Sequence, residues 1–317
     1  MGVPQGSILG PILFLLYIND LYKVTDLFTL LYADDTSFII SGKSLDDVII
    51  KLNIELKKVC DWFRSNKLSL HPEKTKFMIF NKQESSINWN EIKIQLNFNN
   101  MNENKPELIT NLGYINSNTE SKAIKFLGVY IDPKLDFKFH IKYVQKKIMN
   151  SLYMLRKLKN TLSKESLRTL YFSLIDCHIN YCLPIWSSGL PSSLKPIYLL
   201  QKKAVRIITN SKYNTHSPPL FRKLGILPIH EQSEFSKLSF MHDFINGKLP
   251  SSFNDTWKRN SDLNLRIIRD RNKFNVPLVK FTSIERFPFC YFQKLWNEKC
   301  DNDLLNSNQR KKYSQRI

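Results

Sequence analysis

The segment TLLYADDTSFII, residues 29–40, constrains the fold of this chain more than any other stretch. It places two aspartates, Asp34 and Asp35, between an apolar run and a run of β-forming residues. Short runs of this kind on either side of turn-forming residues are typical of β-hairpins. We therefore predict a hairpin from Phe28 to Ile40 with both aspartates at its turn. Aspartate is a common turn residue, so the pair alone does not indicate a function.

Two neighbouring carboxylates repel each other, and one pKa rises unless a cation is close by. Mg²⁺ prefers oxygen ligands and commonly takes one or two carboxylates together with substrate phosphates. Two such ions, ~3.5–4 Å apart, can activate an attacking hydroxyl and stabilise a leaving group. Asp34 and Asp35 are therefore candidate ligands for Mg²⁺ or Mn²⁺.

The net charge of the chain favours a polyanionic partner. Its 317 residues include 47 Lys and Arg against 28 Asp and Glu, which gives +19. Nucleic acid is the commonest partner of so basic a protein, and a membrane surface is the rival. The longest apolar run, ILGPILFLLYI, is about half of the ~20 residues that a membrane span requires. We therefore expect no membrane association.

The cysteines indicate an intracellular protein of the nucleus or cytoplasm. There are five, an odd number in a chain of this length, which favours a reducing compartment. Cys177 and Cys182 flank His178, but their spacing fits no zinc pattern. We interpret them as buried thiols.

Hydrophobic periodicity predicts the main elements. Residues 12–22 are apolar almost all round, which indicates a buried helix. Apolar residues recur every three or four positions in two further segments, which we predict to be amphipathic helices, 44–64 with a Ser44 cap and 137–157. Segments 75–80 and 123–131 are predicted strands. The Asn-rich segment 81–121 is interpreted as an insertion or irregular hairpin with a possible strand at 91–98.

Four segments, in order along the chain, resemble motifs of reverse transcriptases. YADD, residues 32–35, resembles their aspartate hairpin, and GVPQGSILGPILFLLYINDL, residues 2–21, resembles the loop and helix under the templating base pair. NKLSLHPEKTKFMIF, residues 66–80, resembles the following motif, and KFLGVYID, residues 125–132, resembles the primer-grip strand pair. The specific resemblance is to non-LTR retrotransposons of the jockey and related LINE types. It extends to their thumb and the region beyond, through segments 167–186, 200–232 and 271–297.

The resemblance implies an α+β fold. A partial polymerase palm over residues 1–132 would combine an antiparallel sheet, made by the hairpin and the strands at 75–80 and 123–131, with packed helices. Residues 133–212 would form a helical thumb. Residues 213–317 would form a helical C-terminal region whose role the sequence does not indicate.

The resemblance also assigns roles in the palm. Asp34 would bind metal, Asp35 would support the metal ions, and Lys74 would protonate the departing pyrophosphate. Gln5 and Gly6 would lie against the incoming nucleotide, and Gly permits such close approach. Read without the family, Lys74 is a solvated lysine and the glycine is loop punctuation.

The primer grip and thumb supply the remaining candidates. Phe126, Leu127 and Gly128 would hold the primer terminus, although as plain sequence they are an ordinary strand. A lysine stripe on the predicted helix 137–157 would contact phosphates, although such faces are commonly only solvated; its members are Lys138, Lys142 and Lys146. Three tryptophans are interpreted as core residues, namely Trp186, Trp257 and Trp296.

The implied function is RNA-directed DNA polymerisation, which uses an RNA template, a DNA primer and a deoxynucleoside triphosphate. The sequence starts at the glycine-proline loop, and the family carries a further catalytic aspartate and finger segments before that loop. We therefore expect this polypeptide alone to incorporate no nucleotide. The alternatives are a non-catalytic nucleic-acid-binding remnant of such an element and an unrelated metal-dependent phosphatase.

Overall fold

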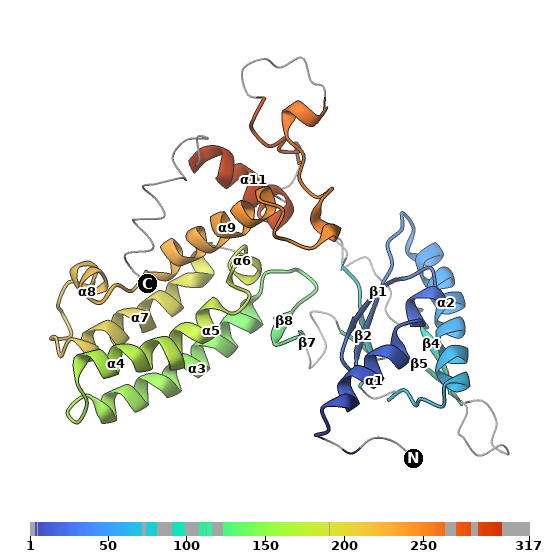
Figure 1. Ribbon diagram of the computed structural model, residues 1–317, viewed down its shortest axis with the longest axis horizontal. Helices are drawn as coiled ribbons and strands as arrows, with labels where there is room; N and C mark the ends of the chain where they lie inside the picture. The colour runs from blue at the N-terminus through green and yellow to red at the C-terminus, as the bar shows by residue number, and fades with distance from the viewer. Residues whose placement is uncertain are drawn as a thin grey trace. The chain divides into compact units, whose positions relative to one another are not determined.

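The chain divides into two compact units, Met1–Lys122 and Ala123–Ile317, drawn as a ribbon in Figure 1. The computed structural model describes residues 4, 6–71, 74–80, 91–98, 108–111, 113–115, 123–189, 191–263, 271–279 and 285–299. Among these residues, no helix combines the length and the apolar character needed to cross a membrane.

Within its described residues, the first unit combines two helices with short strands. The helices are α1 (Leu9–Ile18) and α2 (Leu45–Ser65), with a 3₁₀ turn at Leu21–Lys23. The strands are β1 (Phe28–Tyr32), β2 (Asp35–Ile39), β3 (Lys76–Met78), β4 (Gln95–Phe98), β5 (Leu108–Asn111) and β6 (Gly113–Ile115). Of the possible strand at 91–98, the part Gln95–Phe98 is present as β4.

The described strands form four two-stranded sheets, so the single palm sheet predicted from the sequence is wrong for this part of the chain. β1 pairs with β2 and β4 with β5, both antiparallel, whereas β3 and β6 are parallel. The fourth pair, β7 (Ile124–Phe126) with β8 (Val129–Ile131), lies in the second unit. Three of the four pairs join strands that are neighbours in sequence, and such local pairing costs little loop-closure entropy.

Helix α1 is present, but the prediction that it is buried is wrong. The side chain of Ser7 accepts a hydrogen bond from the Gly10 amide at 3.2 Å, as a helix-capping residue does. Of the helix residues, Ile18 is buried, and Phe14 packs against the same cluster. The other apolar side chains are about half exposed or more, because the core lies on one side of the helix only; they are Leu9, Ile12, Leu13, Leu15, Leu16 and Tyr17.

Helix α2 forms the centre of the first unit, as its periodicity predicts. Val59 and Phe63 pack with Ile18 and with Leu31 and Phe38 of the hairpin. Leu56 and Cys60 pack with Ile94 and Leu96 around β4. Ser44 is the residue before the helix, but its side chain makes no capping hydrogen bond.

The second unit is mainly helical. Its helices are α3 (Lys138–Leu158), α4 (Lys164–Tyr171), α5 (Cys177–Asn180), α6 (Leu183–Trp186), α7 (Lys195–Ile208), α8 (Ser217–Leu224), α9 (Ile229–Ile245) and α11 (Pro288–Lys299). A π-helical turn at Phe172–Asp176 joins α4 to α5. Short 3₁₀ turns lie at Pro191–Leu194, Ser251–Phe253 and Asn260–Leu263.

Two apolar clusters hold the described part of this unit together. The larger one contains the predicted apolar side of α3, all of it buried, namely Ile141, Val144, Ile148, Leu152 and Leu155. The smaller one gathers around α9 and α11. Trp186, Trp257 and Trp296 are buried in these clusters, as predicted. Cys177 and Cys182 are exposed, so their interpretation as buried thiols is wrong; both follow the π-helical turn at positions that face solvent.

Candidate functional site

The turn of the β1–β2 hairpin lies one residue earlier than predicted. Tyr32 pairs with Asp35, so Ala33 and Asp34 form the two-residue turn and Asp35 is the first residue of β2. Ala33 adopts the left-handed conformation, with φ of 50°. Sequence favoured Asp-Asp at the turn because aspartate is a frequent turn residue, whereas positive φ is uncommon for alanine. Both aspartates are exposed at the hairpin tip.

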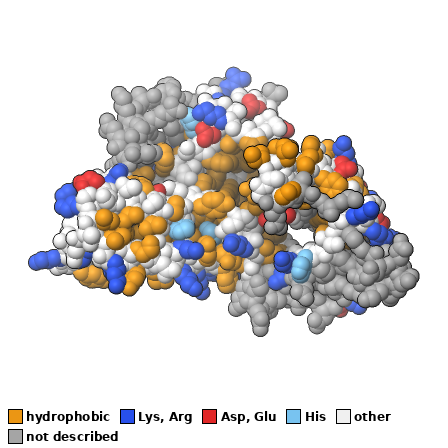
Figure 2. Space-filling view, turned by 60° about the horizontal axis from the view of Figure 1, so that its bottom comes forward, with side chains coloured by type: hydrophobic (Ala, Val, Ile, Leu, Met, Phe, Trp, Pro, Cys, Tyr) orange, Lys and Arg blue, Asp and Glu red, His pale blue; other side chains and the backbone are white. Residues whose placement is uncertain are grey.

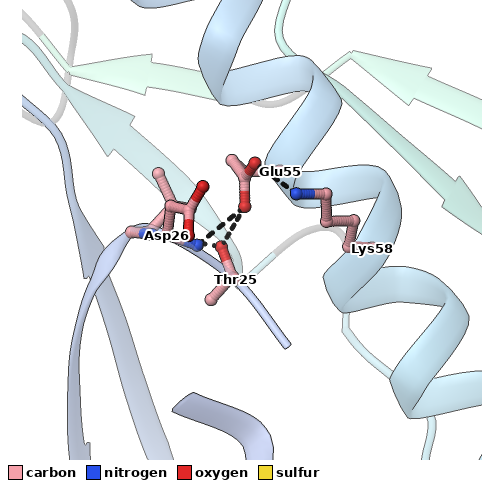
Figure 3. Close-up of polar contacts among 5 residues, drawn as sticks. Thr25, Asp26, Glu55 and Lys58 are labelled. Atoms are coloured by element: carbon pink, nitrogen blue, oxygen red, sulfur yellow. Dashed lines mark hydrogen bonds and ion pairs between the residues drawn. The ribbon is translucent and has the colours of Figure 1, made fainter. Parts of the chain in front are cut away.

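A buried carboxylate fixes the segment that enters the hairpin. Glu55 of α2 is 3% exposed. Its Oε2 atom accepts hydrogen bonds from the Thr25 hydroxyl and the Asp26 amide, both at 2.8 Å, as Figure 3 shows. The Lys58 ammonium donates to Oε1 at 2.7 Å. These bonds lower the pKa of Glu55 to about 2, and the bond from Lys58 has the largest effect.

Glu55 was not among the candidates from sequence, although a signal was present. It lies on the apolar side of α2, three residues after Leu52 and four before Val59, and next to buried Leu56. A carboxylate on a helix face that packs into a core needs hydrogen-bond partners. Its partners immediately precede β1, so Glu55 positions the strand that leads to Asp34.

The chemistry of the hairpin tip fits a divalent cation that has further ligands. Two adjacent carboxylates are the kind of oxygen donors that Mg²⁺ and Mn²⁺ accept, with water and substrate phosphates completing the shell. The side chains of Asp34 and Asp35 make no hydrogen bond or ion pair with another described residue, so their carboxylate oxygens are available. Within the described ranges, no three His, Cys, Asp or Glu side chains gather as a metal site.

The other described palm candidates are Lys74 and Gly6, and no hydrogen bond links either of them to the hairpin among the described residues. Lys74 is exposed on the turn before β3, where its amide donates to the His71 carbonyl at 3.2 Å. Gly6 has φ of 84°, and a Cβ at this position would meet no atom within 4 Å. Glycine is therefore required there by conformation rather than by space within the chain. Gln5 lies outside the described residues.

The predicted primer grip is a tight hairpin with a tyrosine against its turn. Phe126 pairs with Val129, and the turn residues Leu127 and Gly128 have φ of 43° and 87°. The Tyr181 hydroxyl donates to the Leu127 carbonyl at 2.5 Å. A Cβ on Gly128 would lie 3.0 Å from the Tyr181 ring, so both the conformation and the close approach require glycine. Nothing in the sequence marks Tyr181, which lies 54 positions from Leu127.

The predicted lysine stripe on α3 is exposed. Lys138 forms an ion pair with Asp136 at 2.5 Å, which raises the lysine pKa. The Lys142 ammonium lies 6.0 Å from the centre of the Phe139 ring. Lys146 adds a third cation on this surface.

Aromatic side chains accompany the basic ones on α3, a feature that the spacing of the lysines does not predict. Lys147 lies 5.6 Å from the Tyr143 ring centre and Lys157 lies 5.4 Å from that of Tyr153. Figure 2 shows basic and hydrophobic side chains interspersed over this unit. Mixed basic and aromatic surfaces suit nucleic acid, because cations contact phosphates and rings contact bases or sugars.

Comparison with known proteins supports the resemblance read from the motifs. Residues 1–131 match the family described as reverse transcriptase (RNA-dependent DNA polymerase). Three relatives from Drosophila melanogaster are similar over more of the chain. The probable RNA-directed DNA polymerase from transposon BS is 26% identical over 242 residues, 73% of this chain and 25% of that protein. The corresponding X-element protein is 24% identical over 241 residues, 73% of this chain and 24% of its own length.

The third relative is the RNA-directed DNA polymerase from mobile element jockey, 25% identical over 236 residues, 71% of this chain and 24% of that protein. The chain therefore spans about a quarter of the length of the curated relatives that it matches. No solved structure matches it significantly.

Proposed function

Because residues 1–131 match the family described as reverse transcriptase and the chain is similar to RNA-directed DNA polymerases of Drosophila mobile elements, we propose that it contributes the aspartate hairpin, primer grip and thumb of such a polymerase. The observation that carries the proposal is the YADD motif, which lies within the matched region with both carboxylates exposed at a hairpin tip. In this assignment the first unit is the palm and α3 belongs to the thumb.

The proposed chemistry is two-metal nucleotidyl transfer. Bound Mg²⁺ or Mn²⁺ would supply Lewis-acid stabilisation to the attacking and leaving oxygens. Asp34 and Asp35 would hold the ions, and Lys74 would hold a proton for the departing pyrophosphate. Gln5 and Gly6 would leave room for the deoxynucleoside triphosphate.

The second unit would hold the nucleic acid. The turn formed by Phe126, Leu127 and Gly128 would contact the primer terminus, and Tyr181 would keep this turn rigid through its hydrogen bond to Leu127. The lysines of α3 would contact phosphates of an RNA template paired with a DNA primer without reading the bases. With such partners the protein would act inside the cell, in the nucleus or cytoplasm.

Mn²⁺ binding tests the hairpin assignment, and the chain provides its own control. Asp46 and Asp47 are a second exposed Asp-Asp pair, in the first turn of α2. Mn²⁺ binding can be followed by loss of the free-ion electron paramagnetic resonance signal, without added nucleotide, because a triphosphate binds Mn²⁺ itself. We expect Asp34→Asn with Asp35→Asn to weaken binding at least about tenfold, which corresponds to ~1.4 kcal/mol. Asp46→Asn with Asp47→Asn should bind as the unaltered chain does, and equal losses in both pairs would refute the assignment.

Hybrid binding tests the α3 assignment. The affinity for an RNA–DNA hybrid should fall with salt, and Lys142→Gln and Lys146→Gln should each lower the slope of log K against log salt by about 0.9. Lys164→Gln, at an exposed lysine that begins α4, is the charge-matched control and should leave the slope unchanged. An unchanged slope in all three variants would show that α3 does not contact phosphates.

Primer extension separates the polymerase from the non-catalytic alternative. Any extension by this chain, alone or as part of a longer polypeptide, should disappear in Asp34→Asn. The same assay tests the expectation that the chain alone incorporates no nucleotide. A chain that binds the RNA–DNA hybrid, but whose Mn²⁺ binding does not depend on Asp34, would favour a nucleic-acid-binding remnant. The basic and aromatic surface of α3 is the observation that supports this alternative.

A further inference from the structure

The second unit contains a strongly basic groove that the polymerase assignment leaves unused. It lies where α3 and α7 both end, at the opposite end of α3 from Lys138. The groove has a volume of about 310 Å³. The residues that define it here are Arg156, Lys159, Lys203, Arg206 and Tyr213.

The charge of this basic groove is not balanced within the described part of the chain. Four of its lining residues are basic, the rest are uncharged, and none is acidic. No described carboxylate forms an ion pair with any of the four cations. Helix C-termini attract cations, which accounts for Arg156 and Arg206 in the last turns of α3 and α7. Lys159, the C-cap residue of α3, fits the same rule, whereas Lys203 lies inside α7 and raises the local positive potential further.

An exposed aromatic ring lies beside these cations. Tyr213 is 83% exposed, unusually high for so large a side chain. The Arg206 guanidinium lies 5.8 Å from the centre of the Tyr213 ring. The arginine itself is fixed, because its Nε and Nη2 atoms donate to the Thr215 carbonyl at 3.0 and 2.9 Å.

The turn that carries Tyr213 is also held in place. The Thr215 amide donates to the Lys212 carbonyl at 3.1 Å, which closes the turn around the tyrosine. Before it, the Ser211 amide donates to the Arg206 carbonyl at 3.0 Å. The ring is therefore presented to solvent by bonded backbone on both sides, next to a fixed guanidinium.

We infer that the basic groove binds single-stranded nucleic acid, with one unpaired base stacked on Tyr213 and the adjoining phosphates on Arg156, Lys159 and Lys203. Unpaired bases are free to stack on aromatic side chains, whereas the bases of a duplex already stack on one another. The volume of about 310 Å³ suits a strand contacted one nucleotide at a time. The inference rests on the proposed function only in taking nucleic acid as the partner.

Fluorescence anisotropy with labelled oligothymidylate and oligouridylate tests this inference on the full chain. We expect Tyr213→Ala to weaken binding of both strands about tenfold and Tyr213→Phe to retain it, because stacking needs the ring and not the hydroxyl. Lys203→Gln should lower the salt slope by about 0.7. DNA and RNA should behave alike, since neither stacking nor phosphate contact reads the 2′-hydroxyl.

Matched controls come from elsewhere in the chain. Tyr22 is 51% exposed and lies 5.8 Å from the Lys23 ammonium, so Tyr22→Ala removes a similar ring–cation pair. Tyr22→Ala and Lys164→Gln should bind both strands as the unaltered chain does. Unchanged affinity in Tyr213→Ala, or an equal loss in Tyr22→Ala, would overturn the inference. Binding to phosphatidylserine vesicles but to neither oligonucleotide would also overturn it, in favour of a membrane surface.

The two proposals fail in different ways. If the polymerase assignment is wrong, Mn²⁺ binding will not depend on Asp34, while single strands still bind through Tyr213. If the basic groove is not a single-strand site, Tyr213→Ala will bind oligothymidylate normally, whatever the outcome at the hairpin.

Discussion

At the scale of single residues, the hairpin tip combines an exposed acidic pair with a strained backbone. Ala33 has φ of 50°, and the left-handed conformation costs a residue with a Cβ roughly 1–2 kcal/mol. The strain persists because the strands on both sides determine the turn. Unusual backbone conformations of this kind often occur at functional sites.

Ala33→Gly should therefore raise the free energy of unfolding, by about 1 kcal/mol, because glycine adopts positive φ without steric cost. Urea unfolding followed by circular dichroism measures it. The same substitution at Ala204, in the middle of α7 and fully buried, should act in the opposite direction by a similar amount. A destabilised Ala33→Gly would show that the turn is not strained.

Glu55 should make stability depend on acid pH. Its folded pKa of about 2 lies below its ordinary value of 4.5, so the carboxylate stabilises the fold above pH 4.5. That contribution is lost as the pH falls from 4.5 towards 2. Glu55→Gln should lower the free energy of unfolding at neutral pH by about 1–3 kcal/mol and flatten its pH dependence in that window.

Asp61→Asn is the matched control for this measurement. Asp61 lies on the same helix and pairs with Arg64 at 3.2 Å, but its side chain is 51% exposed. Exposed pairs contribute roughly 0–1 kcal/mol, so this variant should change stability little. If the two variants lose the same stability, the hydrogen bonds of Glu55 are no stronger than those of a surface pair.

At the scale of elements, α1 shows how an apolar sequence can form a helix that is largely exposed. Its residues are apolar on every side, and the sequence alone therefore predicted burial. In the structure, contact with the core runs through Phe14 and Ile18. The remaining apolar side chains form an exposed surface, a feature that commonly marks interaction sites or a tendency to aggregate.

Substitutions on the two sides of α1 should therefore have unequal effects. Leu13→Gln with Leu16→Gln should change the free energy of unfolding by no more than about 0.5 kcal/mol per site, because both side chains are exposed. Ile18→Ala should cost about 2–5 kcal/mol, because Ile18 is 3% exposed. Chemical denaturation of the double variant and of Ile18→Ala measures the two changes in the free energy of unfolding. A large loss in the double variant would place the exposed side of α1 in a core.

At the scale of the whole molecule, each unit has its own apolar core among the described residues. The clusters around α2 and the hairpin draw their described members from residues 14–96. The clusters of the second unit draw theirs from residues 129–296. Separate cores favour separate cooperative unfolding.

Ile148→Ala tests this separation, because Ile148 is fully buried in α3. We expect it to destabilise the second unit by about 2–5 kcal/mol. Hydrogen exchange measured by mass spectrometry should then show faster exchange in peptides from α3, α4 and α7. Peptides from α2 and β1 should exchange as in the unaltered chain, and faster exchange there would show that the units unfold together.

The sequence by itself determined the elements whose patterns are local: the hairpin, α2, the apolar side of α3 and the ordered motifs that indicated the family. These depend on residues a few positions apart, so periodicity and turn chemistry predict them. Only the tertiary structure decided the position of the hairpin turn, the division of the strands into separate pairs and the exposure of α1. It also decided that Glu55 holds Thr25, 30 positions away, and that Tyr181 covers Gly128. Such contacts depend on how distant segments pack, and a single sequence carries no local signal for that packing.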